Sequence, residues 1–173
     1  MEESILLNKD YFSDDQYIIA KYDVESRDLK MHSHEFWEIS YVHESEGTSY
    51  FGNDVAEPIT PGEFIFISPG AIHCIQSPPS DKGAWVRVCN LLVRNEYIDM
   101  LVNDLILIYG FDEYLLPKMI KEHQPFCIHF KDQSRIVLNM LTSAAHEYKF
   151  PSQASETVIK NLATNIFIYN TFL

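Results

Sequence analysis

The sequence contains few cysteines and few basic residues. Its three cysteines, Cys74, Cys89 and Cys127, are odd in number and lack the C-x-x-C spacing of zinc knuckles. This argues against a disulfide framework and predicts that the three side chains are small buried hydrophobic groups. Only 13 Lys and Arg residues stand against 25 Asp and Glu residues, so the formal net charge is −12. Because such a surface repels phosphate groups, we expect no direct contact between this chain and DNA.

The sequence also lacks the segments that direct a protein into a membrane. No run approaches the roughly 18 apolar residues that span a bilayer, and the acidic start at residues 1–7 precedes no long apolar stretch. We therefore expect a cytoplasmic protein with no membrane partner. Its 173 residues suffice for one domain with a buried core, with or without a helical extension.

Short β-rich segments separated by Gly and Pro turns occupy residues 16–93. The turns recur at the intervals of an antiparallel sandwich or small barrel, so we expect residues 1–93 to form a β-barrel. From residue 94 the apolar residues follow a helical period, which predicts a helix over 97–108 and two more over 132–150 and 155–173. We expect a short apolar segment at 126–130 to return as a strand to the barrel. The sequence thus predicts a mainly β fold with a helical segment over 94–173.

Candidate ligands gather in two segments of the β-rich part. His32, His34 and Glu38 lie in a stretch that reads as one strand, and alternation along a strand places all three on one face. His73 follows a second turn, at Pro69–Gly70. The segments resemble the paired motifs of the cupin superfamily, H-x-H-x-x-x-E and P-x-G-x-x-H, except that Ser68 replaces the first proline of the second motif. The resemblance implies a cupin-like antiparallel β-barrel, also called a double-stranded β-helix or jelly roll.

The same motifs, followed by two helices, resemble the amino-terminal domain of AraC-family bacterial transcription regulators. The resemblance rests on residues 32–42, on the turn at 61–63 with the apolar strand after it, and on residues 69–73. It implies a barrel that binds a small effector, commonly a sugar, and a helical pair that joins two protomers. It also implies a carboxy-terminal helix-turn-helix domain that binds DNA. This sequence contains no such domain, so we expect it to be a part of a longer protein.

The predicted site has two alternative forms. In the first, His32, His34, Glu38 and His73 line the barrel and hydrogen-bond a polar effector, which we expect to be a sugar. In the second, their three imidazoles and one carboxylate hold a divalent transition metal such as zinc, manganese, iron or nickel. The residues alone leave both forms open.

Aromatic side chains of the β-rich part are the predicted stacking partners of a sugar. Phe36 shares the strand face of the histidines, and we expect it to line the site together with Tyr50 and Phe66. Trp37 points to the opposite face of the same strand and is expected to pack against the helices.

The last predicted helix is apolar almost all round. Such a helix must be covered by the barrel, by a second copy or by another domain. We predict a homodimer whose interface includes Ile159, Leu162, Ile166, Phe167 and Tyr169.

Two functions are consistent with these features. The first is a non-enzymatic sensor and dimerisation domain that binds a small effector and controls a DNA-binding domain outside this sequence. The alternative is a stand-alone metal-dependent cupin enzyme, such as a dioxygenase or a sugar isomerase. The apolar last helix and the abrupt end at Phe172–Leu173 favour the sensor, because an enzyme would need neither. We therefore predict no catalytic residues.

Overall fold

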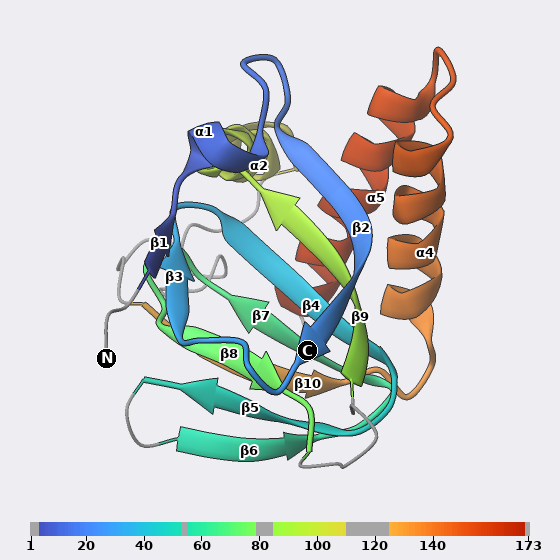
Figure 1. Cartoon of the computed structure of the whole chain (residues 1–173). Helices are drawn as coiled ribbons and strands as arrows, with labels where there is room; N and C mark the ends of the chain where they lie inside the picture. The colour runs from blue at the N-terminus through green and yellow to red at the C-terminus, as the bar shows by residue number, and fades with distance from the viewer. Residues whose placement is uncertain (1–3, 53–54, 79–84, 110–124, 172–173) are drawn as a thin grey trace.

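In the part of the chain that the structure describes, ten strands form two five-stranded sheets that face each other (Figure 1). The computed structural model describes residues 4–52, 55–78, 85–109 and 125–171. Sheet A has the order β1 (Ser4–Leu6), β3 (His32–His34), β8 (His73–Gln76), β5 (Gly47–Phe51) and β6 (Val55–Ile59). Sheet B has the order β10 (Cys127–Lys131), β7 (Glu63–Ile67), β4 (Trp37–Glu44), β9 (Trp85–Val93) and β2 (Ile18–Ser26). All pairings are antiparallel except that of β1 with β3.

This arrangement confirms a mainly β, cupin-like jelly roll. Within the described ranges, no strand pairing joins the two sheets into a closed barrel. The segment expected to return near residue 126 is β10, which pairs with β7 over its whole length and therefore belongs to sheet B.

The expectation of a single strand over residues 32–38 is wrong. The chain leaves sheet A after His34, bends at Glu35 and Phe36, and enters sheet B at Trp37. Two hydrogen bonds hold the bend: the Glu35 amide donates to the Leu6 carbonyl (3.2 Å), and the Asn95 side chain donates to the Glu35 carbonyl (3.0 Å). The two parts of the first motif thus belong to different sheets.

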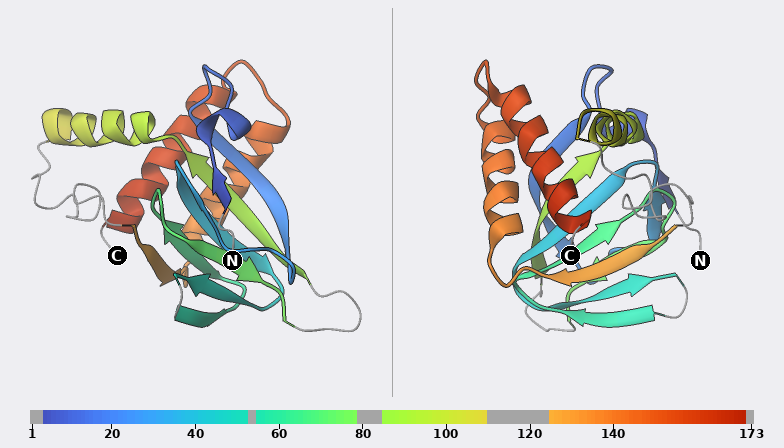
Figure 2. Two further views of the ribbon diagram at one scale, coloured as in Figure 1. Left: turned by 60° about the vertical axis from the view of Figure 1, so that its left-hand side comes forward. Right: turned by 180° about the vertical axis from the view of Figure 1, so that it is seen from behind.

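Four helices lie in the described part of the chain: α1 (Asn8–Tyr11), α2 (Asn95–Tyr109), α4 (Ile136–Lys149) and α5 (Ser155–Thr171). Helix α2 extends away from the sheets, whereas α4 and α5 lie side by side against sheet B (Figure 2). The Asp132 carboxylate accepts hydrogen bonds from the amides of Ile136 and Leu138, both at 3.0 Å, and so satisfies free donors at the start of α4. None of the described helices is long and apolar enough to span a bilayer.

Sheet B separates two apolar cores because its strands alternate between faces. In β7, Phe64 and Phe66 belong to the core beneath the helices, whereas Ile65 and Ile67 belong to the core between the sheets. Trp37 lies in the helix-side core, 5.4 Å from Phe66 between ring centroids, so the prediction that it packs toward the helices is confirmed. Phe66 is therefore not a cavity residue, and its predicted role as a stacking partner of the effector is wrong.

Helix α5 is covered by the β-sheet, which corrects the predicted dimer interface. Ile166 has no exposed surface, and Ile159 and Phe167 are also buried in the helix-side core. Leu162 and Tyr169 are partly buried against the same core. The apolar faces of the last helix thus stabilise the monomer, because sheet B and α4 already bury them.

Candidate functional site

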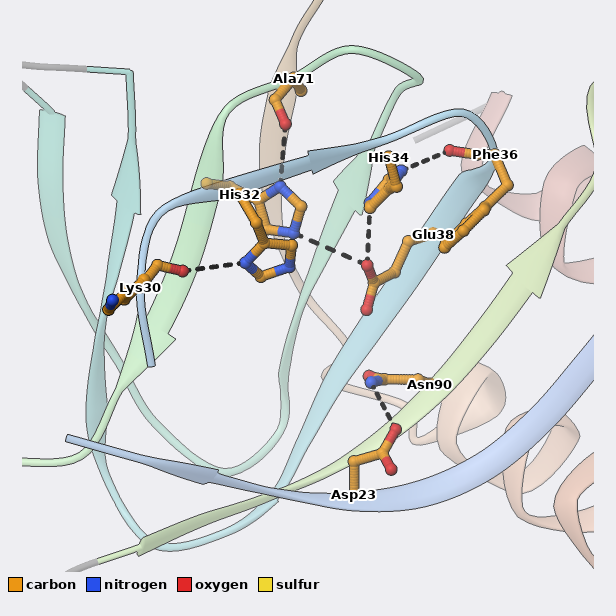
Figure 3. Close-up of polar contacts among 9 residues, drawn as sticks. Asp23, Lys30, His32, His34, Phe36, Glu38, Ala71 and Asn90 are labelled. Carbon is orange, nitrogen blue, oxygen red and sulfur yellow. Dashed lines mark hydrogen bonds and ion pairs between the residues drawn. The ribbon is translucent and has the colours of Figure 1, made fainter. Parts of the chain in front are cut away.

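The chain reversal after β3 brings two histidines and one glutamate together between the sheets. Nε2 of His34 lies 3.0 Å from Oε2 of Glu38, and Nε2 of His73 lies 3.6 Å from the same oxygen (Figure 3). All three side chains are buried. One potential ligand atom from each lies within 4.8 Å of the others. His34, Glu38 and His73 are called the triad below.

Backbone carbonyls fix the orientation of both imidazoles. Nδ1 of His34 lies 2.6 Å from the Phe36 carbonyl oxygen, and Nδ1 of His73 lies 3.0 Å from the Ala71 carbonyl oxygen (Figure 3). Because a carbonyl only accepts hydrogen bonds, each Nδ1 carries a hydrogen and each Nε2 faces Glu38. The turn that delivers His73 is fixed by Gly70, whose φ of 77° suits glycine and whose amide donates to the His34 carbonyl (2.8 Å).

This orientation allows the triad two states. An imidazole whose Nδ1–H is already engaged donates to Glu38 only when it also carries a proton on Nε2 and is cationic. A neutral imidazole instead presents its Nε2 lone pair toward the carboxylate, as a metal ligand does. Burial alone would raise the pKa of Glu38, but its contacts with His34 and His73 outweigh burial and hold this pKa well below its usual range. Glu38 is therefore ionised.

His32 lies beside the triad and not within it. It is paired with His73 across sheet A, with ring centroids 4.6 Å apart, and its Nδ1–H donates to the Lys30 carbonyl (3.0 Å). Burial and the nearby His73 lower the pKa of His32, so its imidazole is mainly neutral at neutral pH. Of the four histidine and glutamate residues predicted from the motifs, three converge and His32 borders them.

A cavity of about 370 Å³ opens beside the triad, within the size range of small-molecule sites. The polar residues that line it, apart from Tyr11, are Ser4, Lys21, Asp23, Glu25, Lys30, His32, Glu38 and Asn90. Two aromatic residues, Tyr11 and Phe36, also line it. A pocket of about 20 Å³ lined by Glu25, His32, Glu38 and His73 connects this lining to the triad.

Strands β2 and β9 also contribute to this cavity, which the sequence motifs did not indicate. Nζ of Lys21 and Nδ2 of Asn90 both contact Oδ2 of Asp23, at 3.0 and 3.1 Å (Figure 3 shows the Asn90 contact). Burial, together with the charges of Glu38 and Asp23, raises the pKa of Glu25 to about 7. The available signal was the alternation of charged residues at 21, 23 and 25, which places three charges on one face of a strand.

The aromatic predictions have different outcomes. Phe36 lines the cavity and stacks on His34, with ring centroids 4.4 Å apart and planes 6° apart. Tyr50 does not line it, because it is paired with Cys74 in sheet A and shares the strand face opposite to that of His73. Tyr11, which was not predicted, takes a place in the lining and lies 5.2 Å from Phe36 between ring centroids.

A second cavity of about 710 Å³ lies on the other side of His34. It is lined by Trp37, Asn95 and Pro125 among others, and Pro125 adjoins a segment outside the described ranges. The first cavity is lined by Glu38 and by the charged face of β2. It is therefore the better-defined candidate site of the two.

The triad also fits a divalent transition metal. Two neutral imidazoles and a carboxylate are a common ligand set for zinc and iron, and both imidazoles have the carbonyl partners on Nδ1 that are typical of metal-bound histidines. When bound, such a metal would supply a Lewis acid at the floor of the cavity. His32 would need to reorient to join these ligands.

Comparisons with known proteins agree with this architecture. Two structures of ToxT from Vibrio cholerae strain SCE256 match 90% and 91% of this chain, with TM-scores of 0.56 and 0.57 and 14% sequence identity. One is the apo K231A variant and the other is the wild-type protein with a bound unsaturated fatty acid. The matches cover 56% of each ToxT chain, so this chain spans little more than half of their length. At this identity the likeness shows a shared fold.

No curated protein sequence matches the chain. The model of one protein family, however, matches residues 16–131, which run from the segment before β2 to the end of β10 and include the whole triad. That family is described as the AraC-like ligand binding domain. Because the match covers about two thirds of the sequence, this chain belongs to the AraC-like ligand binding domain family.

Proposed function

We propose that this chain is the effector-sensing domain of an AraC-type transcription regulator and that its effector is a small polar molecule of the carbohydrate class. The effector binds in the cavity between the sheets, beside the triad. Its binding shifts the population of two conformations and so changes how a DNA-binding domain outside this sequence is presented. The observation that carries the proposal is the cavity itself, with its charged and amide side chains on the inner faces of β2, β4 and β9.

The chemistry of the lining favours a carbohydrate over a fatty acid. ToxT, which shares this fold, binds an unsaturated fatty acid. Here, however, three carboxylates, Asp23, Glu25 and Glu38, line the cavity. A ligand carboxylate would be repelled by them, whereas hydroxyl groups would donate to them. The faces of Tyr11 and Phe36 supply apolar surface for the C–H groups of a sugar ring.

Thermal denaturation with a panel of monosaccharides and short oligosaccharides tests this proposal. A ligand that binds only the folded state raises the melting temperature, by an amount that grows with its concentration. We expect a sugar to stabilise the wild-type chain and Glu38→Gln to abolish that shift, because the variant removes a charged acceptor without changing the side-chain shape. Glu46→Gln is the matched control, since Glu46 is exposed in the connection between β4 and β5. An equal response of the two variants would place the effector elsewhere.

We further propose that the domain forms a homodimer through the outer faces of α4 and α5. Of the residues first predicted for this interface, Ile159, Ile166 and Phe167 are buried within one chain, and Leu162 and Tyr169 are partly buried. Three apolar residues remain exposed at α4 and its end: Ile136, Tyr148 and Phe150. Sedimentation at tens of micromolar protein, about the range in which weak dimers form, should show a dimer. Ile136→Asp should give a folded monomer, and a monomeric wild-type chain would refute this part of the proposal.

A further inference from the structure

A buried acceptor in the cavity has no partner. Asn90 is only 5% exposed, and its Nδ2 donates to Asp23, which fixes the orientation of the amide. Its Oδ1 then has no hydrogen-bond partner in the structure. A buried carbonyl oxygen without a donor costs free energy in the folded state, so a bound group that donates a hydrogen bond would stabilise it.

The charges around this acceptor are unbalanced. Lys21 is paired with Asp23, and Lys30 is exposed at the rim of the cavity. The Glu38 carboxylate is in contact with the two imidazoles of the triad. Glu25 forms no ion pair with any described residue, and its raised pKa reflects burial and the neighbouring carboxylates of Glu38 and Asp23. Apart from Lys30 at the rim, the two unused groups are therefore acceptors: the carboxyl of Glu25 and Oδ1 of Asn90.

We propose that the effector carries a protonated amine together with hydroxyl groups, as an amino sugar does. This inference rests on the proposed effector-sensing function. The amine binds at Glu25, and a hydroxyl donates to Oδ1 of Asn90. Lys21, Asp23 and Glu25 are successive inward positions of β2, about 7 Å apart, and Asn90 is paired with Lys21 across the strands. Asn90 and Glu25 are thus two such steps apart, about 13 Å at the backbone. A ring that bears an amine on one side and hydroxyls on the other spans this distance once a hydrogen bond of about 3 Å is added at each end.

A metal ion bound by the triad is the alternative source of positive charge in this cavity. The donors that converge closely enough for a metal are His34, Glu38 and His73, and neither Glu25 nor Asn90 is among them. A metal there would leave Oδ1 of Asn90 without a donor. A cationic organic ligand satisfies both unused acceptors, so the observations favour the amine.

Matched pairs of compounds test the inference by calorimetry near neutral pH. Glucosamine, galactosamine and mannosamine are each compared with the parent hexose, which differs by one amino group, and glucuronate and oleate are the anionic probes. We expect one amino sugar to bind about tenfold more tightly than its parent hexose. Glu25→Gln should remove this preference, so that the amino sugar and its parent hexose bind the variant with equal affinity. Glu46→Gln, an exposed glutamate, should retain the preference.

Other outcomes overturn the inference in distinguishable ways. Equal or tighter binding of the hexose, or of an anionic probe, would refute the amine and leave effector sensing in place. No heat and no thermal shift with any probe, from a chain that unfolds cooperatively, would refute both. Stabilisation by Zn²⁺ that His73→Gln abolishes, with none by the amines, would assign the cation to the triad and refute the amine.

Discussion

The raised pKa of Glu25 makes the stability of the domain depend on pH in an unusual direction. The pKa of this carboxyl is about 7 in the folded chain, against an ordinary value of 4.5. The folded state therefore holds the proton more tightly than the unfolded state. The contribution of protonated Glu25 to the free energy of unfolding is fully present below pH 4.5, and it is lost as the pH rises to about 7 and above. Glu25→Gln keeps the shape of the side chain and cannot ionise, so it should avoid that loss.

The expected magnitude follows from the shift in pKa. The difference between a pKa of about 7 and one of 4.5 corresponds to about 3.5 kcal/mol, at about 1.4 kcal/mol for each pH unit. Part of the Glu25 side chain is exposed to solvent. Solvent screening therefore reduces this difference in the free energy of unfolding, and we expect about 1–2 kcal/mol. Chemical denaturation should thus show Glu25→Gln to be more stable than the wild type at pH 8 and equally stable at pH 4.5.

The control for this experiment is Glu46→Gln, whose stability relative to the wild type should be the same at both pH values. A difference between wild type and Glu25→Gln that does not change between pH 4.5 and pH 8 would refute the reasoning. It would mean that water or Lys21 neutralises the charge of Glu25 more fully than the cavity geometry indicates.

Three other predictions concern the core, the triad and DNA. Ile166→Asp should unfold the domain, at a cost of about 4 kcal/mol, since Ile166 has no exposed surface; a folded variant in circular dichroism would contradict its burial. Protein purified without added metal should contain no stoichiometric transition metal by elemental analysis, because the cation that we propose for this cavity is organic; one ion per chain, absent from His73→Gln, would show the metal form. The chain alone should not retard a promoter fragment specifically, because its net charge of −12 opposes phosphate binding.

The sequence indicated the fold better than the site. Periodicity located the three long helices, because each has an apolar stripe at helical spacing. The strands of sheet B are apolar on both faces because they separate two cores. Turn spacing placed β6 and β8 within the β-rich part, residues 16–93, without separate bounds. Residues 32–38 were also predicted to form one strand, which is wrong. The convergence of His34 and Glu38 survived that error because the chain reverses between them and returns on the facing sheet.

The apolar residues of the last helix show a second limit. A stripe of Ile and Phe indicates that a surface is buried but does not indicate what buries it. Both an intramolecular sheet and a second protomer satisfy the pattern. Only the packing of Ile166 and Phe167 beneath sheet B decides between them.

Strand β2 shows why part of the cavity lining was missed. Ordinary alternation places apolar side chains inward and charged ones outward. In β2 the order is reversed: Tyr22 and Val24 are 45% and 59% exposed, whereas Lys21, Asp23 and Glu25 face the cavity. The helices cover the outer face of β2 only near Ile18 and Ala20, so the same face becomes solvent-exposed further along the strand. A strand that exposes apolar residues in order to direct charges inward loses stability, and such a conflict with ordinary patterning is expected at a binding site.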